Sequence, residues 1–272
     1  MDNKTFIKIP HNLFTIEKNQ MGEPVGVSKL KQLGTEGFTI WSYLLLIQGN
    51  QVVARTDIKE IIAIFNENKG TRKAKAKNGL SDARTVKKYL NILIKMEMIQ
   101  CEQFDGKLIR LVIEEGSNDF VNVRADDKLF ISVNPMDDGK GFSAISAQLF
   151  FDNVKKMGHI GWSIYCLLYK NHNTGFGNTE ESYGNCGFAS CSEEYIANII
   201  SRNKSTVSEY IHKFPKGLMK IMPQESTTWY DFHREIDVVT YMPNHYVVYA
   251  KGDTENKYYI NNAKKSEKAA QI

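Results

Sequence analysis

The chain carries one pattern of residues twice, and this internal repetition limits the folds that it can adopt. Phe6-Ile7-Lys8-Ile9 recurs 124 positions later as Phe130-Ile131-Ser132-Val133. At the same shift, Gly34, Gly37, Phe38, Ile40, Trp41 and Leu44 correspond to Gly158, Gly161, Trp162, Ile164, Tyr165 and Leu168. At a shift of 121, Val86, Tyr89, Leu90 and Leu93 correspond to Val207, Tyr210, Ile211 and Phe214. Solenoid repeats are only about 20–50 residues long, so this long period indicates a duplicated domain.

The length and composition agree with two globular domains. The chain has 272 residues, of which 42% are hydrophobic and 24% are charged, a balance that argues against wholesale disorder. The longest apolar stretch, 40–47, is far shorter than the ~20 residues that cross a bilayer. The first residues lead into no apolar signal-peptide core. We therefore expect a cytoplasmic protein with no membrane partner.

The first half carries the signals of three helices and a hairpin. Apolar residues recur at three- and four-residue spacing in each predicted helix, which places one face in a core. We expect strands at 6–9, 52–53, 98–104 and 107–114, helices at 35–48 and 57–66, and a third helix that follows a cap at Ser81. Thr56 is the expected cap of the second helix, and Asp105-Gly106 predicts a two-residue turn. This order of elements is the layout of a winged helix, with the hairpin as the wing.

The second half follows the same order with different loops. We expect strands at 128–133, near Phe188, at 217–222 and at 236–250, an extra helix at 144–157, and helices at 159–171, at 193–200 after a Ser192 cap, and at 204–214. The sequence thus predicts an α+β fold, mainly helical, made of two tandem winged-helix (helix-turn-helix) domains related by internal duplication. The predicted domains are 1–118 and 119–260, followed by a disordered tail at 261–272.

Positive charge gathers beside the third helix of the first half. Residues 1–125 hold 19 Lys and Arg against 14 Asp and Glu, whereas 126–272 hold 16 against 17. Residues 69–95 contain nine basic residues and one acidic residue, Asp82. The segment 67–80 shows no apolar periodicity, so we predict that it is a basic loop. Such a concentration beside a helix is expected of a protein that binds a polyanion. The alternative is a solvated helix next to a flexible charged loop.

The side chains opposite the apolar stripes are of types that contact DNA. Arg and Lys donate to guanine or phosphate, Asn pairs with adenine, and Thr contacts the thymine methyl group. The candidate DNA-binding residues of the first domain are Arg72, Lys73, Lys75, Lys77, Ser81, Arg84, Thr85, Lys87, Lys88 and Asn91, with Lys107 and Arg110 on the wing. Those of the second domain are Arg202, Lys204, Ser205, Thr206, Ser208 and His212, and Glu209 is a possible cytosine reader. The alternatives are an ordinary wet helix face and, for the wing, an edge strand protected by charge.

The N-terminal half also resembles a known family. The likeness covers residues 5–112 and rests on three features of the sequence. These are Phe6-Ile7-Lys8-Ile9-Pro10 with Leu13-Phe14, the helix around Tyr43-Leu44-Leu45, and Thr85-Val86-Lys87-Lys88-Tyr89-Leu90 ahead of Met98-Ile99. In these features the chain resembles the winged-helix domain of replication initiators from Gram-positive plasmids and phages. The tandem pair is similar to initiators that bind short repeated origin sequences. The resemblance implies a role in DNA replication, with host replication proteins as partners.

The sequence therefore predicts a protein that binds double-stranded DNA in a sequence-specific manner and acts as a replication initiator of a mobile element. Homodimerisation is a further hypothesis. A transcriptional or conjugation-accessory regulator is the first alternative, and a winged-helix protein-interaction module is the second. We expect no enzyme, since the chain has no Gly-rich phosphate loop. We also expect no cofactor and no metal, because the one conceivable zinc set, Cys186, Cys191 and His172, lacks a fourth ligand. Asp231, His233 and Glu235 fit a charged strand better than a catalytic set.

Overall fold

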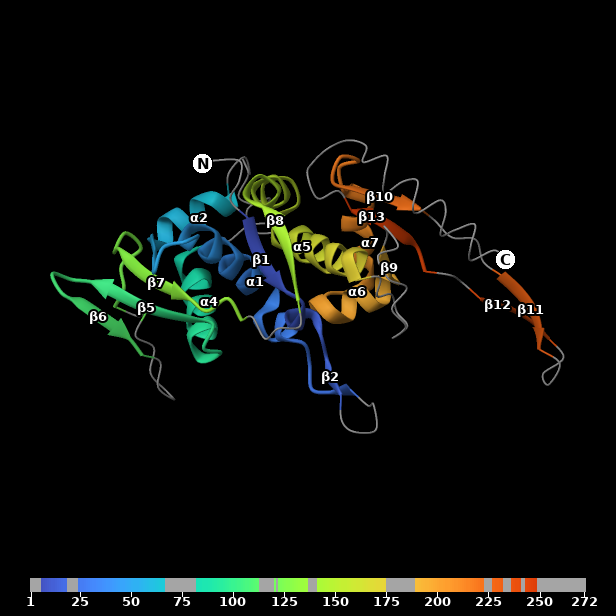
Figure 1. Cartoon of the computed structure of the whole chain (residues 1–272), viewed down its shortest axis with the longest axis horizontal. Coiled ribbons are helices and arrows are strands. Elements are labelled where there is room, and N and C mark those ends of the chain that lie inside the picture. The colour runs from blue at the N-terminus through green and yellow to red at the C-terminus, as the bar shows by residue number, and fades with distance from the viewer. Residues whose placement is uncertain are drawn as a thin grey trace. The chain divides into compact units, whose positions relative to one another are not determined.

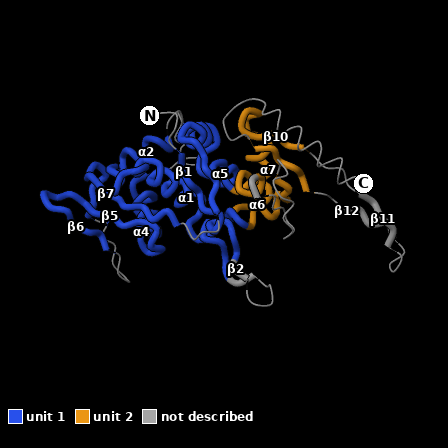
Figure 2. Tube along the Cα trace, viewed as in Figure 1, with its two compact units in different colours: residues 1–166, 199–201 blue, residues 167–198, 202–272 orange. Residues whose placement is uncertain are grey.

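The computed structural model describes residues 6–18, 24–66, 82–112, 120, 122–136, 141–174, 189–222, 227–231, 236–240 and 243–248. Helices and strands both contribute to it, which confirms the predicted α+β class. The chain divides into two compact units, Met1–Cys166 with Ile199–Ser201 and Leu167–Asn198 with Arg202–Ile272 (Figure 2). The domains 1–118 and 119–260 rest on the sequence repeat and stay a prediction.

The first unit is built from helices and short antiparallel strands (Figure 1). Its elements are β1 (Phe6–Pro10), the 3-10 helix η1 (His11–Phe14), β2 (Glu17–Lys18), β3 (Pro24–Val25), α1 (Lys29–Gln48), β4 (Ala54–Thr56), α2 (Ile58–Asn66), α4 (Ala83–Lys95), β5 (Ile99–Phe104), β6 (Leu108–Leu111), β7 (Leu129–Val133) and β8 (Phe142–Ser146). Helix α5 (Ala147–Thr174) begins in this unit and ends in the second. The predicted strand at 6–9 and the three predicted helices of this half are confirmed, and α1 starts six residues before the predicted 35–48.

The first unit contains a four-stranded antiparallel sheet in the order β4-β7-β5-β6. Strand β7, which the repeat assigns to the second domain, pairs with both β4 and β5 and so separates them. One face of the sheet is buried through Cys101, Leu111 and Ile131. Because α1 packs on β4 and β7 and α4 packs on β5, this inner face is the one that the helices cover.

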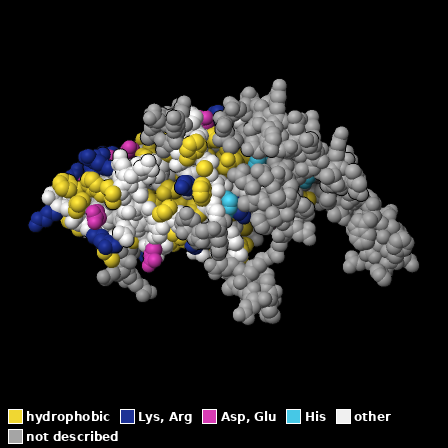
Figure 3. Space-filling view, in the orientation of Figure 1, with side chains coloured by type: hydrophobic (Ala, Val, Ile, Leu, Met, Phe, Trp, Pro, Cys, Tyr) yellow, Lys and Arg dark blue, Asp and Glu magenta, His cyan; other side chains and the backbone are white. Residues whose placement is uncertain are grey.

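The outer face of the sheet, opposite the helices, carries exposed apolar side chains. Phe104 and Leu108 are 54% and 57% exposed, and Figure 3 shows hydrophobic side chains gathered over the β5–β6 hairpin. Further along this face, the Arg55 guanidinium lies 5.9 Å from the centre of the Phe130 ring. Strand β1 does not join this sheet and pairs with β8 in a separate two-stranded ribbon.

Both long helices are interrupted at a glycine that belongs to the repeat. Ser28 caps α1 by accepting a hydrogen bond from the backbone N–H of Lys31 at 3.1 Å. Within α1, Gly34 has φ 70° and ψ 165°. Within α5, Gly158 has φ 67° and ψ −166°. These dihedral angles fall in a region that only glycine occupies readily, so each helix changes direction at this residue.

We expect Gly34→Ala to lower the free energy of unfolding by about 1–3 kcal/mol, because a Cβ atom is disfavoured at these dihedral angles. The site itself has room, since an added Cβ would lie 3.6 Å from its nearest neighbour. Urea unfolding followed by circular dichroism measures the loss. The control is Gln32→Ala, an exposed position on the same helix, which should stay within about 0.5 kcal/mol. Equal stability of the two variants would contradict the strain assigned to Gly34.

Several contacts within the first unit join residues that lie 124 positions apart. A hydrogen bond of 2.9 Å links Thr35 Oγ1 to His159 Nδ1, and both residues are buried. The ring centres of Phe38 and Trp162 are 6.4 Å apart with an angle of 18° between the planes. Asn12 Nδ2 donates to the Met136 carbonyl at 3.1 Å. Residues with the same position in the two copies of the repeat thus touch each other.

Two predicted helix caps are each displaced by one residue. The cap of α2 is Asp57, whose Oδ1 accepts from the Glu60 N–H at 2.8 Å, whereas the Thr56 hydroxyl donates to the Glu60 carboxylate at 3.0 Å. The cap of α4 is Asp82, and Ser81 lies outside the described residues. The predictions of Thr56 and Ser81 as caps are therefore wrong. Asp caps a helix about as well as Ser and better than Thr, so the aspartate next to each predicted residue takes its place as the cap.

Several predicted elements have different bounds in the structure, and the strand predicted at 236–250 is two strands, Ile236–Thr240 and His245–Val248. Positions 52 and 53 are not a strand, since β4 begins at Ala54 and Val52 is 84% exposed. The predicted helix at 144–157 starts at Ala147 because β8 occupies 142–146, and it continues through Gly158 into the predicted helix 159–171. The hairpin turn contains three residues, 105–107, because Phe104 pairs with Leu108. The predicted loop 67–80 and tail 261–272 lie outside the described residues.

The second unit contains two short helices and two small sheets. Its elements are the end of α5, β9 (Ala189–Ser190), α6 (Glu193–Ile200, whose last two residues belong to the first unit), α7 (Lys204–Lys213), β10 (Met219–Met222), β11 (Thr227–Asp231), β12 (Ile236–Thr240) and β13 (His245–Val248). Strands β10, β13 and β9 form one sheet, and β11 pairs with β12. The predicted Ser192 cap is confirmed, since its Oγ accepts from the Tyr195 N–H at 3.1 Å. The helices predicted at 193–200 and 204–214 are also confirmed, and the second ends one residue earlier, at Lys213.

Among the described residues, every helix is too short or too polar to reach from one side of a lipid bilayer to the other.

Candidate nucleic-acid interface

Helix α4 starts at a strong local signal. Asp82 Oδ1 accepts a hydrogen bond from the backbone N–H of Thr85 at 2.7 Å. This bond lowers the pKa of the Asp82 carboxyl group, and a bond from the Thr85 hydroxyl and the positive charge of Arg84 lower it further. The cap therefore stays ionised at neutral pH and satisfies one of the free N–H groups of the first turn. Because the Thr85 hydroxyl is engaged at the cap, its methyl group is the part left for a contact outside the helix.

One face of α4 is committed to the core. Val86, Leu90 and Leu93 are fully buried. Tyr89 lies against the interrupted part of α1, where a Cβ atom added to Gly37 would come within 3.0 Å of Tyr89 Cδ1. Glycine at this position therefore lets α1 and α4 approach closely. The packing holds α4 in one rotational setting, so its opposite face points outward.

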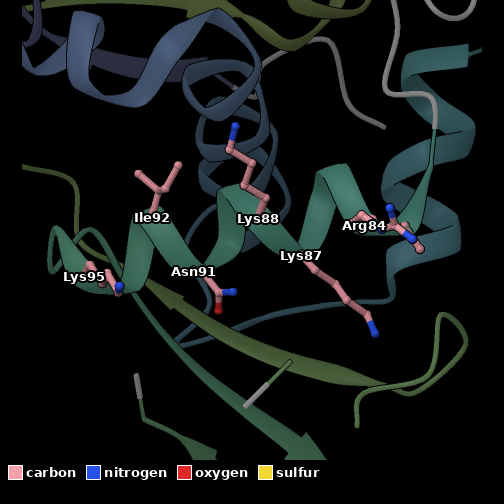
Figure 4. Close-up of a pocket in the computed structure, with 7 residues that line it drawn as sticks. Arg84, Lys87, Lys88, Asn91, Ile92 and Lys95 are labelled. Atoms are coloured by element: carbon pink, nitrogen blue, oxygen red, sulfur yellow. The ribbon is translucent and has the colours of Figure 1, made fainter. Parts of the chain in front are cut away.

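That outward face is basic. It forms an open depression of about 680 Å³ lined by Ala83, Arg84, Lys87, Lys88, Asn91, Ile92 and Lys95 (Figure 4). Four of these seven lining residues are basic and none is acidic. Figure 4 shows Lys87 and Asn91 on one side of the helix and Lys88 and Ile92 on the other. The Lys88 ammonium lies 5.4 Å from the centre of the Tyr89 ring.

The structure thus brings together five of the predicted residues, Arg84, Thr85, Lys87, Lys88 and Asn91, on one helix. The loop residues Arg72, Lys73, Lys75 and Lys77, like Ser81, lie outside the described residues. The depression also contains Ala83, Ile92 and Lys95, which the prediction of site residues missed. Lys95 follows Lys88 by seven residues, which is about two helical turns, so spacing alone was enough to place it on the same face.

The two residues that the sequence predicts on a wing are in different settings. Lys107 is exposed in the turn of the hairpin, whereas Arg110 is exposed on β6 directly opposite Glu102 of β5. Side chains directly opposite on one face of an antiparallel pair are neighbours. The positive charge of Arg110 is therefore offset by a nearby carboxylate, and that of Lys107 is the more available to a phosphate.

In the second unit, α7 buries Val207, Tyr210 and Ile211 and so has the same one-sided character as α4. Its outward residues are the exposed Lys204, Ser205 and His212 and the partly exposed Thr206, Ser208 and Glu209. His212 Nδ1 lies 2.8 Å from the Ser208 carbonyl oxygen, and Glu209 forms an ion pair with Lys213.

Positive charge is scarcer on this helix than on α4. Arg202, at the turn before α7, is partly buried and its Nε atom is inaccessible to solvent. The outward face of α7 carries the exposed Lys204, while Lys213 is held by Glu209. The basic face of α4 is therefore the stronger candidate interface.

Comparisons of the chain with protein-family models, with curated proteins and with solved structures found no match.

Proposed function

We propose that this chain binds double-stranded DNA in a sequence-specific manner, with α4 as its main reading helix. One observation carries the proposal, namely the depression along α4 that four basic side chains line and that no acidic side chain of the described residues enters. An α-helix fits the major groove of B-DNA, which is about 12 Å wide. Because the opposite face of α4 is fixed in the core, the basic face can enter the groove without unfolding any packed element.

We assign the first unit to the winged-helix class. The order α1, β4, α2, α4, β5 and β6 supports this assignment, with β5 and β6 as the wing. Strand β7 is an addition to the simplest form of such a fold, since it fills the space between β4 and the wing. Lys107 at the tip of the wing is a second contact to the DNA backbone within this proposal.

We also propose that the chain arose by internal duplication. In a two-fold symmetric arrangement, residues near the axis touch their own counterparts. The pairs Thr35–His159 and Phe38–Trp162 are counterparts in the sequence repeat and are in contact. The matching interruptions at Gly34 and Gly158 point the same way. In this view α7 is the counterpart of α4 and the second reading helix.

The residues of α4 have separable roles in the proposal. Arg84 and Asn91 have the donors that recognise guanine and adenine edges, respectively. Lys87, Lys88 and Lys95 are point charges suited to phosphates, which position a protein on DNA without reading its sequence. The first unit therefore supplies both base recognition and most of the electrostatic free energy of binding.

We expect Arg84→Ala to relax base preference at one position of the bound site, with a loss of about 1–3 kcal/mol for the preferred base. Selection from random duplexes, carried out with the wild-type chain and the variant, measures the preference position by position. The matched variant Lys88→Ala should weaken binding to all sequences alike and reduce the slope of log affinity against log salt by about 0.9. An unchanged preferred sequence for Arg84→Ala would remove this residue from base recognition.

The same selection tests the function itself. Fluorescence anisotropy with the selected duplex at physiological salt should show tight binding that falls steeply as salt rises. Failure of the wild-type chain to enrich any sequence or to bind duplex DNA would refute the proposal and favour a protein-interaction module instead.

Within this proposal, the resemblance to replication initiators favours a role in starting replication of a mobile element. Footprinting of the wild-type chain on the DNA that flanks its own gene separates this role from regulation. Directly repeated protected sites would support initiation. A single inverted repeat at a promoter would support a transcriptional regulator instead.

A further inference from the structure

The outer face of the β5–β6 hairpin has a composition that differs from the α4 face. Phe104 and Leu108 lie directly opposite each other near the turn and are both more than half exposed. Two residues further along the strands, Glu102 lies directly opposite Arg110. Side chains two positions apart in a strand share a face, so these four residues form one patch, which we call the wing patch.

The wing patch is half apolar and carries no net charge. Its one basic residue, Arg110, is balanced by one acid, Glu102, whereas a surface that binds DNA carries an excess of positive charge. Large apolar side chains that gather on an exposed surface mark sites of protein contact. Phe104 and Leu108 lie on the face of the sheet opposite the helices and are more than half exposed, so they do not contribute to the core.

The charges of the wing patch are complementary to those of a second copy of the same patch. Suppose that a two-fold axis runs along the hairpin, between β5 and β6, and that two hairpins face each other. Each β5 residue of one copy then meets a β6 residue of the other copy. That β6 residue is the one with which it pairs across the strands within its own hairpin. Glu102 of one copy meets Arg110 of the other, and Phe104 of one copy meets Leu108 of the other. Both kinds of contact occur twice, as an isologous interface requires.

We propose that the wing patch is a homodimer interface, in which two copies of this chain pack through the outer faces of their β5–β6 hairpins. The helix α4 packs on the inner face of the sheet and is not part of this interface. The dimer is a property of the hairpin alone and does not depend on DNA binding. It does, however, supply two copies of α4 to any partner that α4 binds.

The decisive experiment uses two charge-reversed full-length variants, Glu102→Arg and Arg110→Glu. Each alone places like charges at both symmetric contacts, so each should be monomeric in sedimentation velocity at concentrations where the wild-type chain is dimeric. When the two variants are mixed, opposite charges face each other again at both contacts, and the dimer should return. Within each variant chain, positions 102 and 110 carry the same charge whether or not the variants are mixed. Recovery of the dimer on mixing therefore reports a contact between chains. Two results would overturn the proposed arrangement. One is that the wild-type chain is dimeric and both variants remain dimeric, and the other is that a mixture of the two monomeric variants forms no dimer.

The apolar half of the patch is tested separately, which guards against misfolding of the charge variants. Phe104→Ala should weaken self-association at least about tenfold, because an aromatic side chain at the centre of an interface commonly carries more than 1.4 kcal/mol. The matched control is Phe6→Ala, which removes an equally exposed phenylalanine, 57% exposed, from β1. The control should dimerise like the wild-type chain. Equal effects of the two substitutions, or a wild-type chain that stays monomeric from micromolar to near-millimolar concentration, would refute the interface.

Discussion

Duplex DNA binding is expected to fall at least about a hundredfold in the variant Lys87→Glu/Lys88→Glu. Each lysine lines the depression on α4, and each charge reversal removes an attraction to a phosphate and adds a repulsion. Facing like charges cost several kcal/mol in an interface, so two reversals exceed the effect of two alanines. Fluorescence anisotropy with the selected duplex, over a range of salt concentrations, measures both the affinity and its salt dependence.

The control for this experiment is Lys155→Glu/Lys156→Glu, at two exposed positions on α5. Each Lys→Glu change lowers the net charge by two, so both double variants reduce the formal net charge from +4 to zero. The control should bind within a few-fold of the wild-type chain. Equal losses in the two variants would show that overall charge, and not the α4 face, determines the affinity.

The largest expected loss of stability follows from Trp162→Ala. Trp162 is fully buried in the first unit. It stacks on Phe38 at 6.4 Å and on Tyr165 at 6.0 Å, and meets Phe150 edge-on at 5.0 Å. Its Nε1 donates to Ser42 Oγ at 3.0 Å. Truncation leaves a cavity among three aromatic rings and removes this bond, so the free energy of unfolding should fall by about 3–5 kcal/mol.

Urea unfolding followed by circular dichroism measures this loss, because the substitution removes a fluorescent reporter. Trp162→Phe keeps a ring in the core but loses the donor to Ser42, so its loss should be intermediate. Phe6→Ala, at an exposed aromatic position, should be close to wild type. A loss below about 1 kcal/mol for Trp162→Ala, the size of an average substitution, would contradict the packing described for this core.

Helix α4 and its exposed face were predictable from the sequence because both depend on local order. The spacing of Val86, Leu90 and Leu93 defines the buried stripe without reference to the rest of the chain. The basic residues between them then occupy the opposite face by helical geometry. The role of Ser192 as a cap was predictable for the same reason, since a cap acts within three residues.

The pairing of the strands was not predictable, because it joins distant parts of the chain. The sequence indicated a strand at 128–133, but the repeat placed it in the second domain and not between β4 and β5. The adjacent valines 52 and 53 have high strand propensity, yet the strand forms at Ala54, where Ile131 is its partner. Strand propensity reflects the fit to neighbouring strands, and those neighbours lie about 80 residues away along the chain, at 129–133.

The position of β7 has a consequence for how the chain acquires its structure during synthesis. The wing and β4 have no direct hydrogen bonds to each other within the described residues, since β7 lies between them. Until Val133 has emerged from the ribosome, β5 has only β6 as a partner, and a lone hairpin is barely stable in water. A nascent or proteolysed fragment that ends near residue 118 would present two open strand edges, which are sites of aggregation. Completion of this sheet is therefore a late event, and the strand β5, on which helix α4 packs, depends on residues that are translated well after it.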